Sequence, residues 1–130
     1  MAYTIMVVDD SDTIRAVLER TLIMTRLPVD EIIQAVNGRD ALEKLADKWV
    51  DIVFTDIHMP EMDGESLVDA MNRDPELADI PVVVVSTEGS TTRIAELRRK
   101  GIKGYLRKPF TPEAIRDIIV ETLGGWDAKQ

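Results

Sequence analysis

The middle of the chain reads Val53-Phe54-Thr55-Asp56-Ile57-His58-Met59-Pro60-Glu61-Met62-Asp63-Gly64. The apolar residues before Asp56 have the composition of a buried β-strand, and they bring this carboxylate to the point where the strand ends. Pro60 disfavours helical geometry at Met59, and Asp63-Gly64 is a typical turn sequence before a helix. The stretch therefore predicts an aspartate that is presented at a surface, between a strand and a rigid loop.

Around this stretch, apolar runs and helical patterns alternate along the chain. Runs with the composition of buried strands span residues 4–8, 32–35, 51–55, 82–85 and 105–107. After each run, apolar residues recur at helical spacing. The helix starts are expected at Ser11 or Asp12, Asn37, Asp63-Gly64, Ser90 and Thr111-Pro112. Continuous apolar strands joined by helices predict one doubly wound α/β domain, with a parallel sheet covered on both faces.

The helical spacing also predicts which side chains face the sheet. The expected inward positions are Ile14, Val17, Leu18 and Leu22 in the first helix, and Ala41, Leu42, Leu45 and Trp49 in the second. In the fourth helix they are Ile94, Leu97 and Ile102, with Gly101 as the stop.

Length and composition limit the classes of protein to consider. A chain of 130 residues can bury a core of its own as one domain. It contains no cysteine, which excludes disulfides and thiolate metal sites. No apolar run approaches the roughly 20 residues that span a bilayer, and no basic segment precedes the first apolar run. We expect a cytoplasmic protein without membrane insertion.

Charge is distributed unevenly. The formal net charge is −8, but residues 1–90 carry 19 acidic and 7 basic side chains, whereas residues 91–130 carry 5 and 9. An acidic body argues against direct nucleic-acid binding, because affinity for a duplex depends mainly on cationic contacts to phosphate. The basic final third is better suited to steering an acidic protein partner.

Polar residues fall at the ends of four predicted strands. Asp9-Asp10, Asp56, Ser86 and Lys108 follow the first, third, fourth and fifth strands. Ligands of open α/β sheets bind outside the carboxyl ends of the strands. Carboxylates that converge there repel one another unless a cation is present, and Mg²⁺ prefers such oxygen ligands. A carboxylate beside Mg²⁺ and a lysine is equipped to attack a phosphoryl group and form an aspartyl phosphate.

Four sequence features occur in a characteristic order. They are Asp9-Asp10, Asp56 followed by Met59-Pro60 and Met62-Asp63-Gly64, Ser86, and Tyr105 through Lys108-Pro109-Phe110. Together they resemble the response-regulator receiver domain of two-component signalling, over about residues 3–123. The resemblance implies a flavodoxin-like (βα)5 fold with strand order 2-1-3-4-5.

The resemblance also implies roles for individual residues. Asp56 would be the phosphoacceptor, and Lys108 would contact the phosphoryl group. Asp10, Asp56 and the backbone carbonyl of His58 would bind Mg²⁺ directly, with Mn²⁺ as a possible substitute, and Asp9 would act through water.

A switch pair is implied as well. Ser86 would move its hydroxyl toward the phosphate, and the Tyr105 ring would turn inward behind it. The family further implies a cis bond before Pro109. Thr87 departs from the small residue that is common after the switch hydroxyl, so we expect its β-branched side chain to slow small phosphodonors. His58 is expected to influence how long the phosphoryl group survives.

Simpler interpretations exist for each residue alone. Asp9-Asp10 could be a helix cap or a solvated turn, Lys108 a surface charge, Ser86 a cap and Tyr105 a half-buried strand residue. A loop imidazole in contact with water is an equally good interpretation of His58. The ordered combination of Asp9-Asp10, Asp56 and Lys108 favours the phosphoryl-transfer site.

The expected signalling surface is formed by the fourth helix, fifth strand and fifth helix. Its basic residues are Arg93, Arg98, Arg99, Lys100, Lys103, Arg107 and Arg116. The expected partners are a sensor histidine kinase or a histidine phosphotransfer protein, and a downstream protein that binds this surface. Monomer or weak dimer is expected.

These features predict a phosphorylation switch in a phosphorelay, not an enzyme. Residues 1–124 would form the receiver domain, and residues 125–130 a short tail without an output domain. The alternatives are a phosphorylation-independent interaction module and the receiver part of a longer regulator. A phosphohydrolase of the haloacid-dehalogenase type is disfavoured because it needs an aspartate two residues after the nucleophile, where this chain has His58.

Overall fold

The computed structural model describes residues 2–87 and 90–123 of the chain, so the expected tail at residues 125–130 lies outside the described part. Along the chain the elements are β1 (Tyr3–Val8), α1 (Asp12–Met24), β2 (Val29–Ala35), α2 (Gly38–Leu45), β3 (Ile52–Thr55), α3 (Gly64–Arg73), β4 (Val82–Ser86), α4 (Thr91–Arg99), β5 (Gly104–Arg107) and α5 (Pro112–Leu123). In the described residues, no helix has both the length and the apolar composition needed to cross a bilayer.

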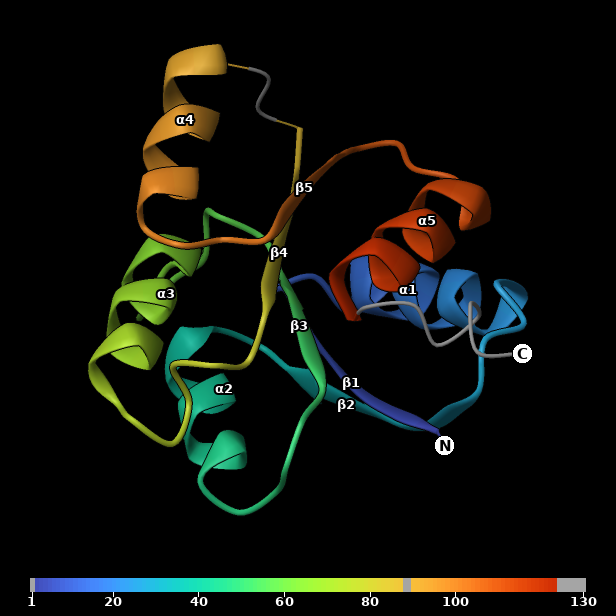
Figure 1. Cartoon of the computed structure of the whole chain (residues 1–130), viewed down its shortest axis with the longest axis horizontal. Coiled ribbons are helices and arrows are strands. Elements are labelled where there is room, and N and C mark those ends of the chain that lie inside the picture. The colour runs from blue at the N-terminus through green and yellow to red at the C-terminus, as the bar shows by residue number, and fades with distance from the viewer. Residues whose placement is uncertain (1, 88–89, 124–130) are drawn as a thin grey trace.

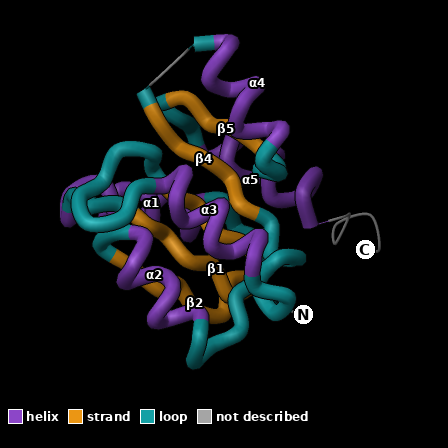
Figure 2. Tube along the Cα trace, turned by 90° about the vertical axis from the view of Figure 1, so that its left-hand side faces the viewer, coloured by secondary structure: helices purple, strands orange, loops and turns teal. Residues whose placement is uncertain are grey.

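The strands form one parallel sheet in the order β2-β1-β3-β4-β5. Helices α1 and α5 cover one face, and α2, α3 and α4 cover the other (Figures 1 and 2). The doubly wound fold and the strand order predicted from the sequence are therefore confirmed.

The two faces of the sheet have separate cores because successive strand residues point to opposite sides. Met6 and Val8 of β1 pack into the cluster on the α2–α4 side, whereas Ile5 and Val7 pack into the cluster on the α1–α5 side. All four side chains are fully buried. Each apolar side chain of this kind contributes about 1.5–3 kcal/mol of burial free energy, which is why the central strands β1, β3 and β4 contain no charged residue.

The strand order reverses direction beside β1. The chain passes from β1 to β2 on one side and then to β3 on the other side, so the loops after β1 and β3 diverge to opposite faces. Val8 lies opposite Thr55 at the end of these two strands, and the Val8 carbonyl accepts a hydrogen bond from the Asp56 amide at 3.0 Å. This register places the carboxyl ends of β1 and β3 side by side, where open α/β sheets bind ligands.

Side chains cap every helix where the sequence predicts a start. Each cap accepts a hydrogen bond from a backbone N–H of the first turn, which stabilises the helix by about 1 kcal/mol. The caps are Ser11, Asn37, Asp63, Ser90 and Thr111. Ser11 rather than Asp12 therefore caps α1, and Asp63 caps α3 in addition to ending the loop.

Two apolar residues that were predicted to face the sheet are exposed. Val17 is 40% exposed because the inward face of α1 runs through Arg15, Leu18 and Leu22, and Val17 lies beside that face. Trp49 is 64% exposed because α2 ends at Leu45, so helical spacing does not apply to it. Both expectations were wrong.

Some element boundaries also differ from the sequence prediction. β2 starts at Val29 rather than residue 32, because it is an edge strand that includes the exposed Asp30 and Glu31. α4 ends at Arg99, and Gly101 adopts a φ of 104° just beyond it. Ile102 is buried as expected, but from the loop that follows α4.

The first residue of α3 packs directly on the backbone beside Asp56. The Gly64 N–H donates to the Ile57 carbonyl at 2.8 Å. A Cβ atom on Gly64 would lie 2.1 Å from the Asp56 carbonyl oxygen, a contact with backbone that cannot rotate away. A side chain at Gly64 would therefore displace either α3 or the loop that carries Asp56.

We expect Gly64→Ala to lower the free energy of unfolding by roughly 1–3 kcal/mol, the usual cost of overpacking, although alanine is the better helix former. Gly104→Ala is the matched control, because its Cβ would meet the end of the flexible Ile118 side chain, 2.4 Å from Cδ1. Urea unfolding of the two variants checks this. Equal losses of stability would show that the Gly64 contact is not the constraint.

Candidate functional site

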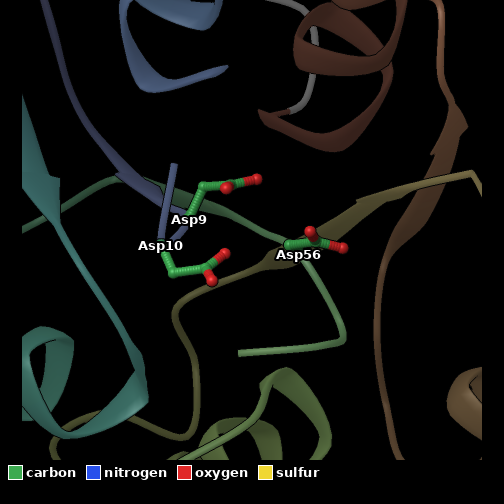
Figure 3. A group of neighbouring side chains, drawn as sticks. All are labelled: Asp9, Asp10 and Asp56. Carbon is green, nitrogen blue, oxygen red and sulfur yellow. The ribbon is translucent and has the colours of Figure 1, made fainter. Parts of the chain in front are cut away.

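Three carboxylates gather at the carboxyl ends of β1 and β3. Asp9 and Asp10 follow β1, and Asp56 follows β3 (Figure 3). An oxygen of each lies within 4.8 Å of an oxygen of the other two. Asp9 is buried, Asp56 is half-buried and Asp10 is exposed. The prediction from the sequence that these three side chains lie close together is confirmed.

Lys108 brings a positive charge to the cluster from the end of β5. Its Nζ atom lies 3.4 Å from Asp9 Oδ2 and 3.4 Å from Asp56 Oδ2. The Lys108 N–H donates to the Ser86 carbonyl at 2.9 Å, which ties the residue to the end of β4. The bond between Lys108 and Pro109 is cis, as the family resemblance implied. Lys108 is thus the cation that sits between two of the carboxylates.

Backbone amides orient the two inner carboxylates. Asp56 Oδ1 accepts a hydrogen bond from the Ile57 N–H at 2.7 Å, and Asp9 Oδ1 accepts one from the Ser11 N–H at 2.9 Å. In both residues the second oxygen faces Lys108. Each carboxylate is therefore held by one neutral donor from the main chain and one charged donor from a side chain.

Negative charge is incompletely balanced in this cluster. Burial raises the pKa of Asp9 above its ordinary value, and the nearby Asp56 carboxylate raises it further; the Ser11 amide and Lys108 act in the opposite direction. Asp9 and Asp56 share the single charge of Lys108, and Asp10 adds a third carboxylate to the cluster, so a further cation would be favoured there. Because all donors are oxygens, the residues fit a hard divalent cation such as Mg²⁺.

Ser86 and Tyr105 lie on one face of the sheet. Ser86 is the buried last residue of β4. Tyr105 on β5 is opposite Val84, and strand residues two apart share a face, so Tyr105 and Ser86 both point to the α4 side. Tyr105 is half-buried and packs against the core on that side. Both residues were predicted from the sequence as a pair, and the strand register places them in adjacent strands.

Two further predicted residues lie at the rim of the site. His58 is exposed in the loop after β3. Thr87 is exposed after β4 and borders a mainly apolar hollow of about 400 Å³ next to the site. The residues that line this hollow are Ile14, Val17, Thr87, Lys108, Pro109 and Phe110. Thr87 therefore stands at an approach to Lys108.

The basic surface is smaller than the sequence suggested. Arg93 Nη2 lies 2.9 Å from Glu65 Oε1, and Lys100 Nζ lies 3.1 Å from Asp69 Oδ1 and 3.4 Å from Glu65 Oε2. These pairs join α4 to α3, because acidic residues on α3 face the basic side of α4. Other basic residues of the surface are exposed: Arg98, Arg99, Lys103, Arg107 and Arg116.

Arg15 was not among the predicted site residues, but it lies next to the cluster, at the backbone of Asp9. Its side chain is only 8% exposed, and Nη1 donates to the Asp9 carbonyl at 2.5 Å. A signal was present in the sequence, because Arg15 precedes Leu18 by three residues and Leu22 by seven. That spacing puts a charged residue on the inward face of a helix, where it needs a buried partner.

Comparison with known proteins identifies one family. The sequence model described as "Response regulator receiver domain" matches residues 5–120. Chemotaxis protein CheY1 of Helicobacter pylori is 35% identical over 121 residues, which cover 92% of this chain and 96% of that protein.

Solved structures show the same fold. The chemotaxis protein CheY4 of Vibrio cholerae superposes with a TM-score of 0.84 at 30% identity, covering 95% of this chain and all of that one. The receiver domain of the sensor histidine kinase PA1611 from Pseudomonas aeruginosa has a TM-score of 0.83 at 18% identity, with 96% of this chain and all of that one covered. That structure contains a magnesium ion coordinated in its active-site cleft.

The raised pKa of Asp9 leads to a pH-dependent prediction for the metal-free protein. A folded-state pKa above the unfolded value means that the folded state binds the proton more tightly. The neutral carboxyl therefore contributes stability below the unfolded pKa of about 3.9, and this contribution is lost as the pH rises through the folded pKa. We expect Asp9→Asn to be more stable than the wild type at pH 7, with an advantage that shrinks on acidification.

Urea unfolding of both proteins in chelated buffer, between roughly pH 4 and pH 7, measures this difference. Asp79→Asn, an exposed acid away from the site, is the control for loss of one negative charge. An advantage of Asp9→Asn that grows on acidification would contradict the direction of the shift.

Proposed function

Because the chain belongs to the response regulator receiver domain family of two-component signalling, we propose that Asp56 accepts a phosphoryl group and that this modification changes the affinity of the domain for a protein partner. The observation that carries the proposal is the gathering of Asp9, Asp10 and Asp56 at one edge of the sheet, with Lys108 next to Asp9 and Asp56. The family consists of signalling proteins rather than enzymes of a classical type, and assistance by this chain in its own modification is part of the proposal.

In the proposed reaction, a carboxylate oxygen of Asp56 attacks the phosphorus of a phosphohistidine or a small acyl phosphate. An O–P bond forms, and the bond from phosphorus to the donor breaks, so that imidazole or carboxylate leaves with the electron pair. Hydrolysis later transfers the phosphoryl group to water and restores the Asp56 carboxylate, which releases inorganic phosphate. The donors are a sensor histidine kinase, a histidine phosphotransfer protein or a small molecule.

The surrounding residues prepare Asp56 for this reaction. The Ile57 amide orients one carboxylate oxygen, and the Lys108 ammonium group offsets negative charge on the incoming phosphoryl oxygens. Ser86 supplies a hydroxyl donor at the end of the neighbouring strand. These groups act by position and charge, which is how phosphoryl transfer is mainly catalysed.

A divalent cation belongs to the proposed site. Asp10, Asp56 and the backbone carbonyl of His58 would bind Mg²⁺ directly, and Asp9 would bind it through water; Mn²⁺ suits the same oxygen donors. The ion would supply positive charge to the phosphoryl oxygens and relieve the repulsion among the carboxylates. The donor set fits this role, because it consists of oxygens and carries excess negative charge.

The proposed output passes through Ser86 and Tyr105 to the surface formed by α4, β5 and α5. Moving a two-state equilibrium from 1:99 to 99:1 requires about 5.5 kcal/mol. Hydrogen bonds to a charged phosphoryl group supply about 1.5–3 kcal/mol each before desolvation. Partner binding would therefore complete a shift that phosphorylation begins. The exposed Arg98, Arg99 and Arg107 suit an acidic partner surface.

The remaining parts of the proposal concern the whole chain. Residues 1–124 would act as one receiver domain, in the cytoplasm, as a monomer or a weak dimer, and without direct nucleic-acid binding. The competing function is an interaction module that works without phosphorylation, and the experiment below distinguishes the two.

We expect acetyl phosphate with Mg²⁺ to add one phosphoryl group to the wild type and none to Asp56→Asn, because the amide lacks the nucleophilic oxygen. Intact mass spectrometry measures the adduct, and omission of Mg²⁺ should slow its formation strongly. Glu61→Gln is the matched control, since it removes an exposed carboxylate from the same loop and should label normally.

An unmodified wild type, or an adduct that persists in Asp56→Asn, would overturn the proposed reaction and favour the interaction module. Beryllofluoride with Mg²⁺ provides a second readout, because it mimics the phosphoryl group without turnover. Its effect on size-exclusion behaviour then reports whether the modified domain dimerises.

Thr87 gives a separate prediction about access to Asp56. Its exposed side chain borders the hollow that also includes Lys108, so Thr87→Ala should accelerate labelling by acetyl phosphate several-fold. Thr87→Ser is the control that removes the methyl group and keeps the hydroxyl. Equal initial labelling rates for wild type and Thr87→Ala would show that this position does not limit the approach of small donors.

A further inference from the structure

Arg15 is a buried cation whose principal partner is a main-chain oxygen. Its side chain is 8% exposed, and Nη1 donates to the backbone carbonyl of Asp9 at 2.5 Å in a buried hydrogen bond. Its ion-pair partner Asp12 is 92% exposed, so that pair contributes about 0–1 kcal/mol. The guanidinium is therefore directed mainly at a main-chain oxygen inside the acidic pair.

The guanidinium group connects three elements of the fold. Nη1 reaches the end of β1 at Asp9, Nη2 contacts Asp12 at the start of α1, and Nε donates to Gln34 Oε1 on β2 at 3.0 Å. Gln34 is itself held, because its Nε2 donates to Glu19 Oε1 at 2.9 Å. The rigid fork of an arginine can satisfy all three directions at once, which the single ammonium of a lysine cannot do in the same geometry.

The carbonyl that Arg15 holds belongs to the peptide group between Asp9 and Asp10. Because a peptide group is planar, fixing this oxygen also fixes the direction of the Asp10 N–H and restricts ψ of Asp9 and φ of Asp10. The Asp9 N–H donates to the Ala35 carbonyl at 3.1 Å, so the preceding peptide is held as well. The directions in which the two carboxylates leave the backbone therefore depend on the contact with Arg15.

We propose that Arg15 is a positioning residue that holds the Asp9–Asp10 peptide so that both carboxylates face Asp56, and that it thereby raises the affinity of the cluster for a divalent cation. This inference rests on the proposed function, because it assumes that the cluster binds Mg²⁺. It deepens that function by assigning part of the metal affinity to a residue that donates no ligand atom.

A purely electrostatic role predicts the opposite effect. A guanidinium close to the cluster repels a cation, so removing its charge would tighten Mg²⁺ binding if charge alone mattered. A positioning role predicts weaker Mg²⁺ binding when the guanidinium group of Arg15 is replaced, even if the positive charge of the side chain is kept. Arg15→Met and Arg15→Lys separate the two roles, since both remove the fork and only the second retains the charge.

The test is a Mg²⁺ titration of each variant without phosphodonor, followed by amide chemical shifts and by calorimetry. Loss of a residue that orients metal ligands typically weakens metal affinity 10–100-fold, and we expect roughly a 10-fold increase in Kd for Arg15→Met. Arg15→Lys should also bind more weakly than the wild type. In metal-free protein, the Ser11 amide that donates to Asp9 Oδ1 should exchange its hydrogen faster in both variants.

Two controls on the same helix isolate the positioning effect. Arg20→Met removes an exposed arginine, and Leu22→Val removes buried volume. Both should leave the Mg²⁺ Kd unchanged, although Leu22→Val lowers the free energy of unfolding. If Arg15→Met does not fold, Arg15→Lys decides the question, because it keeps a long cationic side chain.

The outcomes separate failure of this inference from failure of the proposed function. A wild type that binds Mg²⁺ and forms the Asp56 adduct, with equal or tighter Mg²⁺ binding in both Arg15 variants, would overturn the positioning role alone. A wild type that neither binds Mg²⁺ nor forms the adduct would overturn both. Weaker binding in Leu22→Val equal to that in Arg15→Lys would assign the effect to loss of stability and overturn the inference.

Discussion

Electrostatic repulsion among Asp9, Asp10 and Asp56 is the constraint on which the rest of the site depends. Like charges whose oxygens lie within 4.8 Å of one another are unfavourable, and burial makes the ionised form of Asp9 still less favourable. The chain compensates with donors from several segments: the Lys108 ammonium group, the amides of Ser11 and Ile57, and the Arg15 guanidinium group at the Asp9 carbonyl. The balance remains incomplete, and that deficit of positive charge is the property that suits the site to a divalent cation.

The parallel sheet is what brings these groups together. Because all strands run in one direction, every strand that ends in a polar residue delivers it to the same edge, and the reversal beside β1 opens space between the loops. The same sheet links this edge to a surface. Ser86 and Tyr105 share the face covered by α4, so both lie on the same side of the sheet as that helix.

Predictions from local sequence patterns are correct for features that depend on neighbouring residues in the chain. They are wrong for features that depend on residues close in space but distant in sequence. Strand runs, helix caps and the polar residues at strand ends are local features, and apart from the earlier start of β2 they appear in the structure where expected. Trp49 and Val17 were misplaced because helical spacing does not reveal where a helix ends or how wide its buried face is. Arg93 and Lys100 were predicted to belong to a basic surface, but their partners Glu65 and Asp69 belong to another helix, about 30 residues earlier in the chain.

The sequence by itself predicted the fold class and the convergence of Asp9, Asp10 and Asp56, because continuous apolar strands that end in charged residues are a local signal. The strand order came from the family resemblance. Tertiary structure decided what surrounds them. It showed that Lys108 reaches two carboxylates at once, that α3 packs on the Asp56 backbone at Gly64, and that Arg15 holds the peptide between Asp9 and Asp10. These contacts join residues that are distant in sequence or involve main-chain atoms, and main-chain atoms are the same in every residue. For that reason the pattern of side chains along the chain indicates that Arg15 needs a buried partner, but it does not reveal which atom that partner is.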